Sequence, residues 1–222
     1  MRIHPGAAIA ALSFSALALS ACTLAPPPAV TAPPPAAVAV PTPVAGALTI
    51  DGGASIIAIT VRRGGPLARL GHDHVVAART IEGRVDPAAN RASLRFRLDA
   101  LTVDEAPLRQ QAGLDTQPGE DAIAGTRRNM LTKVLDAERF PWVDVAIERP
   151  AAGGPLATSI TLHGVTRRYQ VPATVVADGG TVRATGSLTL RQTDFGLVPF
   201  AVLGGAMAVQ DALELRFDIV AR

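Results

Sequence analysis

Two histidines flank an aspartate in the segment RLGHDHVV at 69–76, and their types and spacing are the most suggestive of chemistry in this chain. If a strand begins near His72, the side chains of His72 and His74 point to the same face. Two imidazoles on one face can bind Zn²⁺ or Cu²⁺ when a third ligand, such as His163 or Asp73, lies close. They can equally contact a ligand headgroup or hydrogen-bond a loop backbone. The sequence leaves these three interpretations open.

The other reactive residues form no recognisable catalytic site. The DFG at 194–196 is also the magnesium motif of kinases, but no glycine-rich phosphate loop, paired lysine or catalytic-loop aspartate accompanies it. The sequence has no GxSxG elbow, and its only cysteine is Cys22. We therefore predict neither enzymatic activity nor a bound cofactor, and we assign no metal ligand.

The charge distribution argues against nucleic-acid binding. The chain has 21 Lys and Arg against 19 Asp and Glu, a net charge of +2. The basic residues are spread along the whole chain and form no stripe or cluster.

The N-terminus has the features of a lipoprotein signal peptide. An uncharged run of apolar and small residues at 6–21 is too short to span a membrane and has the proportions of a secretory signal. It ends in LSAC at 19–22, which resembles the bacterial lipobox, whose cysteine is acylated. We expect a signal peptide at 1–21, a lipidated Cys22 and a periplasmic protein. Thr23, in place of Asp, favours the outer membrane under the known sorting rule. The alternative is ordinary cleavage near Ala21, which leaves Cys22 unmodified.

A proline-rich linker separates this signal from the folded part. Residues 23–46 carry no charge and contain two proline triplets. Proline lacks a backbone donor and fixes φ near the polyproline value, so this segment cannot join a helix or a sheet. We predict a semi-rigid spacer at 22–46 and one folded domain at 47–222. A proline-rich ligand for a partner domain is the alternative.

Strict alternation of apolar and polar residues dominates the domain and is typical of half-buried antiparallel strands. Glycine and proline clusters separate the alternating runs. The eight expected strands are 55–62, 74–85, 90–101, 142–148, 155–163, 168–177, 181–191 and 206–220.

One segment departs from alternation. Apolar residues recur at helical spacing over 108–135, with Pro118 and Gly119 between them, which predicts a short helical insertion in two pieces. Eight antiparallel strands with hairpin turns favour a closed up-and-down barrel, since closure removes exposed strand edges. A β-sandwich is the competing architecture.

Four short segments, in order and spacing, resemble the YceI-like family of bacterial periplasmic proteins. They are LTID at 48–51, RFPW at 139–142, LHGVTR at 162–167 and TDFG at 193–196. The resemblance covers the whole domain, and it implies a lipocalin-like antiparallel barrel with a long apolar tunnel. It further implies that the tunnel binds a polyisoprenoid or another amphipathic lipid.

We therefore expect a lipid-anchored periplasmic protein that holds an extended apolar ligand, such as a polyisoprenoid, an isoprenoid quinone or a fatty-acid derivative. The residues expected to contact it, apart from the two histidines, are the aromatic side chains of Phe96, Trp142, Phe195 and Phe200. The uncharged loop at 197–205 is either core packing or an apolar rim at the tunnel mouth. Metal binding through His72 and His74, and a structural barrel with a filled core, are the alternatives.

Overall fold

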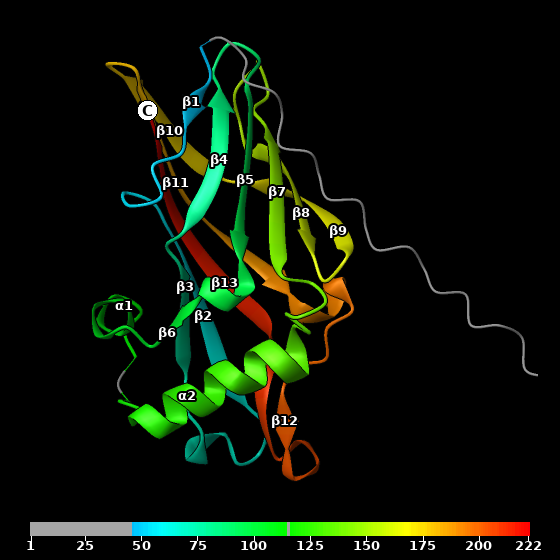
Figure 1. The fold of residues 1–222 in the computed structure, drawn as a ribbon. Coiled ribbons are helices and arrows are strands. Elements are labelled where there is room, and N and C mark those ends of the chain that lie inside the picture. The colour runs from blue at the N-terminus through cyan, green and yellow to red at the C-terminus, as the bar shows by residue number, and fades with distance from the viewer. Residues whose placement is uncertain (1–45, 115) are drawn as a thin grey trace, which may run out of the picture. The chain divides into compact units, whose positions relative to one another are not determined.

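The computed structural model describes residues 46–114 and 116–222 (Figure 1). The expected signal peptide, the acylation at Cys22 and all of the linker except Gly46 lie outside the described residues.

Thirteen strands in the described residues form two antiparallel sheets. The order in the first sheet is β1 (Leu48–Thr49), β4 (Ile81–Asp86), β5 (Arg91–Arg97), β7 (Trp142–Glu148), β8 (Leu156–Leu162) and β9 (Val165–Val171). The order in the second is β10 (Ala173–Asp178), β11 (Thr181–Arg191), β13 (Met207–Ala221), β2 (Ile56–Gly64), β3 (His74–Ala78) and β6 (Thr102–Val103). A short strand, β12 (Ala201–Val202), pairs with β13 alone. The prediction of an all-β antiparallel domain is confirmed.

The alternating runs form the strands because alternate side chains face the interior. In β8 the residues Leu156, Thr158, Ile160 and Leu162 are buried, and the residues between them are more exposed. Two of the eight expected strands are each divided between the sheets: 74–85 becomes β3 and β4, and 168–177 becomes β9 and β10. Pro172 lies at the second division, where its missing N–H cannot continue a ladder.

The expectation of a closed barrel is wrong, because the two sheets do not join into one continuous ladder. The first sheet ends at β1 and β9, and the second ends at β10 and β6. Beside β1, a single bridge pairs Ile50 with Ala221. Thr49 and Arg222 exchange two backbone hydrogen bonds there, of 3.0 and 2.9 Å. The break between β9 and β10 occurs at Pro172, where the chain bends from one sheet to the other.

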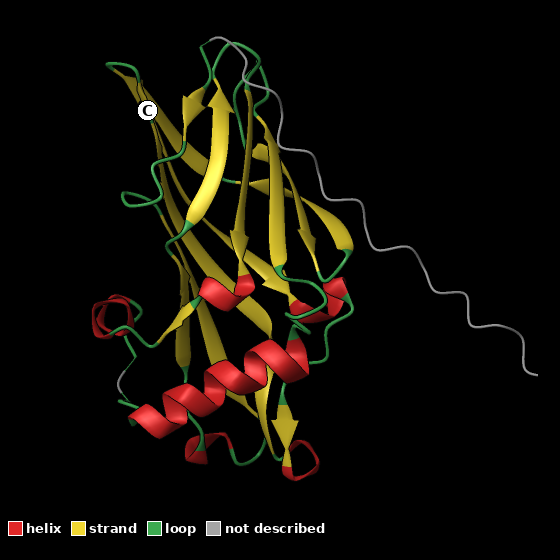
Figure 2. Cartoon of the chain, viewed as in Figure 1, coloured by secondary structure: helices red, strands yellow, loops and turns green. Residues whose placement is uncertain are grey.

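The predicted helical insertion is present in two pieces. They are α1 (Ala106–Gln111) and α2 (Glu120–Asn129), and α2 continues into a wider turn at Met130–Val134. Glu120 and Asp121 in the first turn of α2, and arginines in its last turn, complement the helix dipole. Helix α2 crosses one end of the sheets (Figure 2), and the Arg127 side chain donates to the backbone oxygen of Leu101 over 3.4 Å. The helix thereby covers the region where the short strand β6 leaves the second sheet.

Short helical turns connect several of the strands. They lie at Ala68–Leu70 (η1), Leu98–Ala100 (η2), Gln192–Phe195 (η4) and Leu203–Gly205 (η5). Among the described helices, none combines the length and the apolarity needed to cross a membrane.

Candidate functional site

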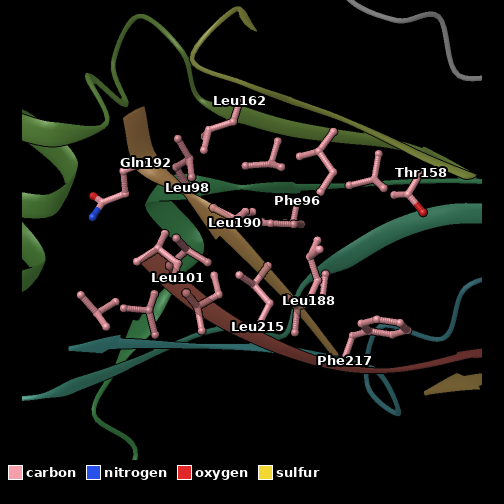
Figure 3. A pocket seen from close by; sticks show the side chains of 18 of the residues that line it. Phe96, Leu98, Leu101, Thr158, Leu162, Leu188, Leu190, Gln192, Leu215 and Phe217 are labelled. Atoms are coloured by element: carbon pink, nitrogen blue, oxygen red, sulfur yellow. The ribbon is translucent and has the colours of Figure 1, made fainter. Parts of the chain in front are cut away.

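A cavity of about 540 Å³ lies between the two sheets. Figure 3 shows side chains from both sheets facing each other across it, among them Phe96, Leu188 and Phe217. Its volume lies in the range typical of small-molecule sites. The expectation of an internal apolar tunnel therefore has a structural basis, and the cavity counts against an interior filled by side chains.

The strand alternation builds the cavity wall. Leu188 in β11 pairs with Leu215 in β13, and both side chains point inward, as do Val143 and Val145 in β7. Leu188, Leu215 and Val145 are half-buried: each packs against the buried core on one side and borders the cavity on the other. An apolar wall of this kind recognises a ligand by shape and by apolar area rather than by specific polar contacts.

The two ends of the cavity differ in their polar residues. Asp86, Asn90, Arg91 and Arg149 lie at the end where β4 meets β5. The guanidinium of Arg91 lies 3.3 Å from the carboxylate of Glu148, and both side chains are exposed. The opposite end, next to α2, carries His72, His74, Thr126 and Asn129. We refer to this second group of four residues as the histidine end.

Both predicted histidines line the cavity, and their ring centroids lie 6.2 Å apart. Nδ1 of His74 lies 2.6 Å from Oδ2 of Asp104. The other ring nitrogen, Nε2, lies 3.4 Å from the hydroxyl of Thr126. Nδ1 of His72 is buried and has no hydrogen-bond partner within the described part of the chain. The structure therefore brings His72 and His74 together at one end of an apolar cavity.

Asp104 and Arg109 fix the position of His74. Oδ1 of Asp104 accepts hydrogen bonds from the backbone N–H of Val75 over 3.0 Å and from Arg109 over 2.5 Å. Arg109 also donates to the backbone oxygen of Asp73 over 2.8 Å. Burial alone would raise the pKa of Asp104, but the hydrogen bonds from His74, Val75 and Arg109 outweigh it and lower that pKa. Asp104 is therefore ionised, and its carboxylate accepts a hydrogen bond from Nδ1 of His74.

Sequence reasoning missed Asp104, Arg109 and Thr126. Asp104 has a positive φ of 57°, a conformation that aspartate tolerates better than most residues. Arg109 is almost completely buried on the short helix α1, where an arginine is not expected. The sequence carries no signal for either feature, because both depend on the long-range pairing of β3 with β6.

The proposed third metal ligands do not reach the histidines. His163 lies in the turn between β8 and β9 with a φ of 52°, and its ring packs on Phe140 with centroids 4.4 Å apart. The Asp73 carboxylate pairs with Arg62 and Arg63. In the described ranges, no group of three or more His, Cys, Asp and Glu residues is arranged to hold a metal ion.

The four predicted aromatic contacts divide into two groups. Phe96 and Phe200 line the cavity. Trp142 lies on the outer face of β7, where the guanidiniums of Arg95 and Arg97 lie 4.3 and 5.2 Å from the centroid of its ring. Phe195 is completely buried and packs near Tyr169, and it does not border the cavity. The structure thus places Trp142 and Phe195 outside the lining of the cavity.

The uncharged loop at 197–205 combines both of its expected roles. Leu197 is buried in the core, whereas Val198 and Leu203 are 77% and 69% exposed. Val202 is 41% exposed and also lines the cavity, as does Leu70, 59% exposed, in the neighbouring turn η1. The backbone N–H of Leu67 donates to the oxygen of Ala206 over 2.8 Å and holds the two loops together. We call the exposed apolar residues Leu70, Val202 and Leu203 the rim.

Two antiparallel sheets define this chain as an all-β protein with an internal apolar cavity. Residues 48–221 match the YceI-like domain family, and the chain belongs to that family. None of the curated proteins matches it.

Two of the solved structures that match this chain illustrate the shared fold. A polyisoprenoid binding domain from Saccharophagus degradans implicated in plant cell wall breakdown has a TM-score of 0.57 at 12% identity, over 79% of this chain and 97% of that one. Burkholderia cenocepacia BcnA has a TM-score of 0.54 at 17% identity, over 78% of this chain and 99% of its own.

Proposed function

We propose that this protein binds one extended apolar ligand in the cavity between its sheets and stores or carries it in the bacterial envelope. The observation that carries the proposal is the apolar cavity of about 540 Å³. The match to the YceI-like family and the fold shared with a polyisoprenoid binding domain support it. The ligand class is a polyisoprenoid, an isoprenoid quinone or a fatty-acid derivative, and the role is binding rather than catalysis.

The energy for binding comes from removing the chain from water. Burial of about 400 Å² of apolar surface contributes roughly 10 kcal/mol before the costs of association and of ordering the chain are subtracted. Since the strand walls already surround the cavity, little of that energy is spent on rearranging the protein.

We further propose that Cys22 is acylated and anchors the protein to the periplasmic side of a membrane, the outer membrane being favoured by Thr23. Two or more acyl chains give stable anchoring, whereas a single chain binds a membrane only reversibly. Labelling cells with a radioactive fatty acid tests this point: the full chain should incorporate label, and the Cys22→Ala variant should not.

The rim is the proposed route of the ligand into the cavity. Leu70 and Val202 are exposed on one side and border the cavity on the other. The loops at 64–71 and 196–207 contain no acidic residue, and their one charged residue is Arg69. An apolar tip without negative charge is suited to contact with an anionic membrane surface.

A cavity-filling variant tests the binding function. Leu188 points into the cavity, and its neighbour Thr189 lies on the exposed face of the same strand. The delipidated protein should take up diphenylhexatriene, a fluorescent apolar rod, with saturation. Leu188→Trp should weaken this uptake at least tenfold, and Thr189→Trp should leave it unchanged. Equal, non-saturable uptake by all three proteins would contradict the proposal.

A further inference from the structure

We propose that the histidine end recognises a neutral hydroxyl headgroup, so that the preferred ligand is a long-chain alcohol rather than its phosphate ester. The inference rests on the proposed function, because it specifies the headgroup of the molecule whose chain occupies the cavity. It follows from the hydrogen-bonding state of His74 and from the charges around the site.

The proton on His74 can be placed from its partner. An ionised carboxylate only accepts hydrogen bonds. The three hydrogen-bonding groups around Asp104, on His74, Val75 and Arg109, stabilise its ionised form. Nδ1 of His74, at 2.6 Å, must therefore donate to Asp104. In the neutral form of His74, on which the inference depends, the other nitrogen is then an acceptor, and Nε2 presents a lone pair.

That lone pair is poorly satisfied by the protein. Its partner, the Thr126 hydroxyl, lies at 3.4 Å, which is long for a hydrogen bond of this type. A buried acceptor with a weak partner costs free energy, and a ligand that donates a better hydrogen bond recovers it. The group at this position should therefore carry a donor hydrogen.

The second histidine supplies the complementary contact. Nδ1 of His72 is buried without a partner among the described residues, and its ring lies nearly perpendicular to that of His74, at 73°. A hydroxyl that donates its one hydrogen to His74 can still accept a hydrogen bond from His72, in the tautomer of His72 that carries its proton on Nδ1. A carbonyl oxygen accepts only, and it would leave Nε2 of His74 unsatisfied.

The charges around the site disfavour a phosphate. Arg109 is neutralised by Asp104. Arg63, which lines the cavity, lies 3.8 Å from the Asp73 carboxylate and also donates to the backbone oxygen of Gly71 over 2.9 Å. A phosphate moved into an apolar cavity needs a counter-charge to offset its desolvation, and both of these guanidiniums are already engaged.

Competition binding on the full chain tests the inference. Diphenylhexatriene is bound first, and it is then displaced by three ligands that share one twenty-carbon isoprenoid chain: the alcohol, its monophosphate and the hydrocarbon without a headgroup. The alcohol should displace the probe at about tenfold lower concentration than either of the others. Equal or tighter binding of the phosphate or the hydrocarbon would overturn the inference.

Variants assign the preference to the histidine end. In the His72→Phe and His74→Phe variants, the alcohol should bind only as tightly as the hydrocarbon without a headgroup. Both variants should still bind diphenylhexatriene. His163→Asn, a histidine outside the cavity, should retain the full preference. A preference that survives both phenylalanine variants would refute the assignment. If the unaltered protein does not bind diphenylhexatriene at all, the proposed function itself is refuted, and with it the headgroup site.

Discussion

Gly186 in β11 lies directly against the ring of Phe217 in β13. A Cβ atom built on Gly186 would lie 2.6 Å from Cζ of Phe217 and 2.5 Å from the backbone oxygen of Pro172. Phe217 lines the cavity. The absence of a side chain at position 186 therefore allows the aromatic ring to lie between the strand and the cavity.

Gly186→Ala should lower the free energy of unfolding by about 1–3 kcal/mol, because the backbone of Pro172 cannot move away as a flexible side chain would. Urea unfolding measures the change. Gly125→Ala is the matched control: Gly125 lies within α2, and no atom lies within 4 Å of its built Cβ. Replacement by the better helix former should raise stability by about 0.5–1 kcal/mol. Equal changes in the free energy of unfolding for the two substitutions would show that the close contact with Pro172 does not destabilise the Gly186→Ala variant.

Asp104→Asn should destabilise the protein by about 3–5 kcal/mol at neutral pH, because it leaves the buried Arg109 guanidinium without a counter-charge. Asp99→Asn is the control. Asp99 also pairs with an arginine, Arg97, at 2.6 Å, but both side chains are exposed, and the loss should stay below about 1 kcal/mol.

The difference in the free energy of unfolding between wild type and Asp104→Asn should disappear in acid. The pKa of Asp104 is lower in the folded state than in the unfolded chain. Its contribution is therefore complete above the unfolded pKa, near 4, and is lost as the pH falls through the folded pKa. Urea unfolding of both proteins at pH 7 and near pH 2 measures this. Since the other carboxylates are common to both proteins, a difference that persists undiminished in acid would show that Asp104 is not the group responsible.

The single tryptophan, Trp142, should not report on the ligand. It lies beneath Arg95 and Arg97, outside the cavity. Its emission should change little when a non-fluorescent apolar chain binds. In a variant combining Trp142→Phe with Phe96→Trp, the indole borders the cavity, and binding should shift its emission to shorter wavelength. A large shift in the unaltered protein would place the ligand elsewhere.

The rim should control the rate of ligand transfer. Leu70→Ser combined with Leu203→Ser removes apolar area from two exposed side chains beside the cavity. We expect transfer of diphenylhexatriene from anionic vesicles to slow several-fold, with unchanged affinity at equilibrium. Val176→Ser is the control, because Val176 is comparably exposed, at 56%, on β10. Equal slowing by the control would exclude a special role for the rim.

The sequence predicted the strands well because each depends on local alternation. The same alternation also indicates on which face of β7 the side chain of Trp142 lies. Val143 and Val145 define the inward parity of β7, so the residue before them must face outward. The division at Pro172 was equally readable from its missing donor. Asp104 and Arg109 were not predictable, because the pair forms only when β6 joins β3 and brings α1 over that strand. The cavity depends on the separation of two whole sheets, which no local pattern encodes.

The hydrogen bonds between Thr49 and Arg222 bring both ends of the described domain to one pole, and the rim beside β12 occupies the opposite pole (Figure 1). A support attached at either end of the domain leaves the rim free to solvent. In the lipoprotein proposed above, this polarity would separate attachment from exchange. The pole with the domain ends would be tethered to the membrane that holds the lipid anchor. The pole with the rim would face across the periplasmic gap, toward a second membrane or an acceptor of the ligand.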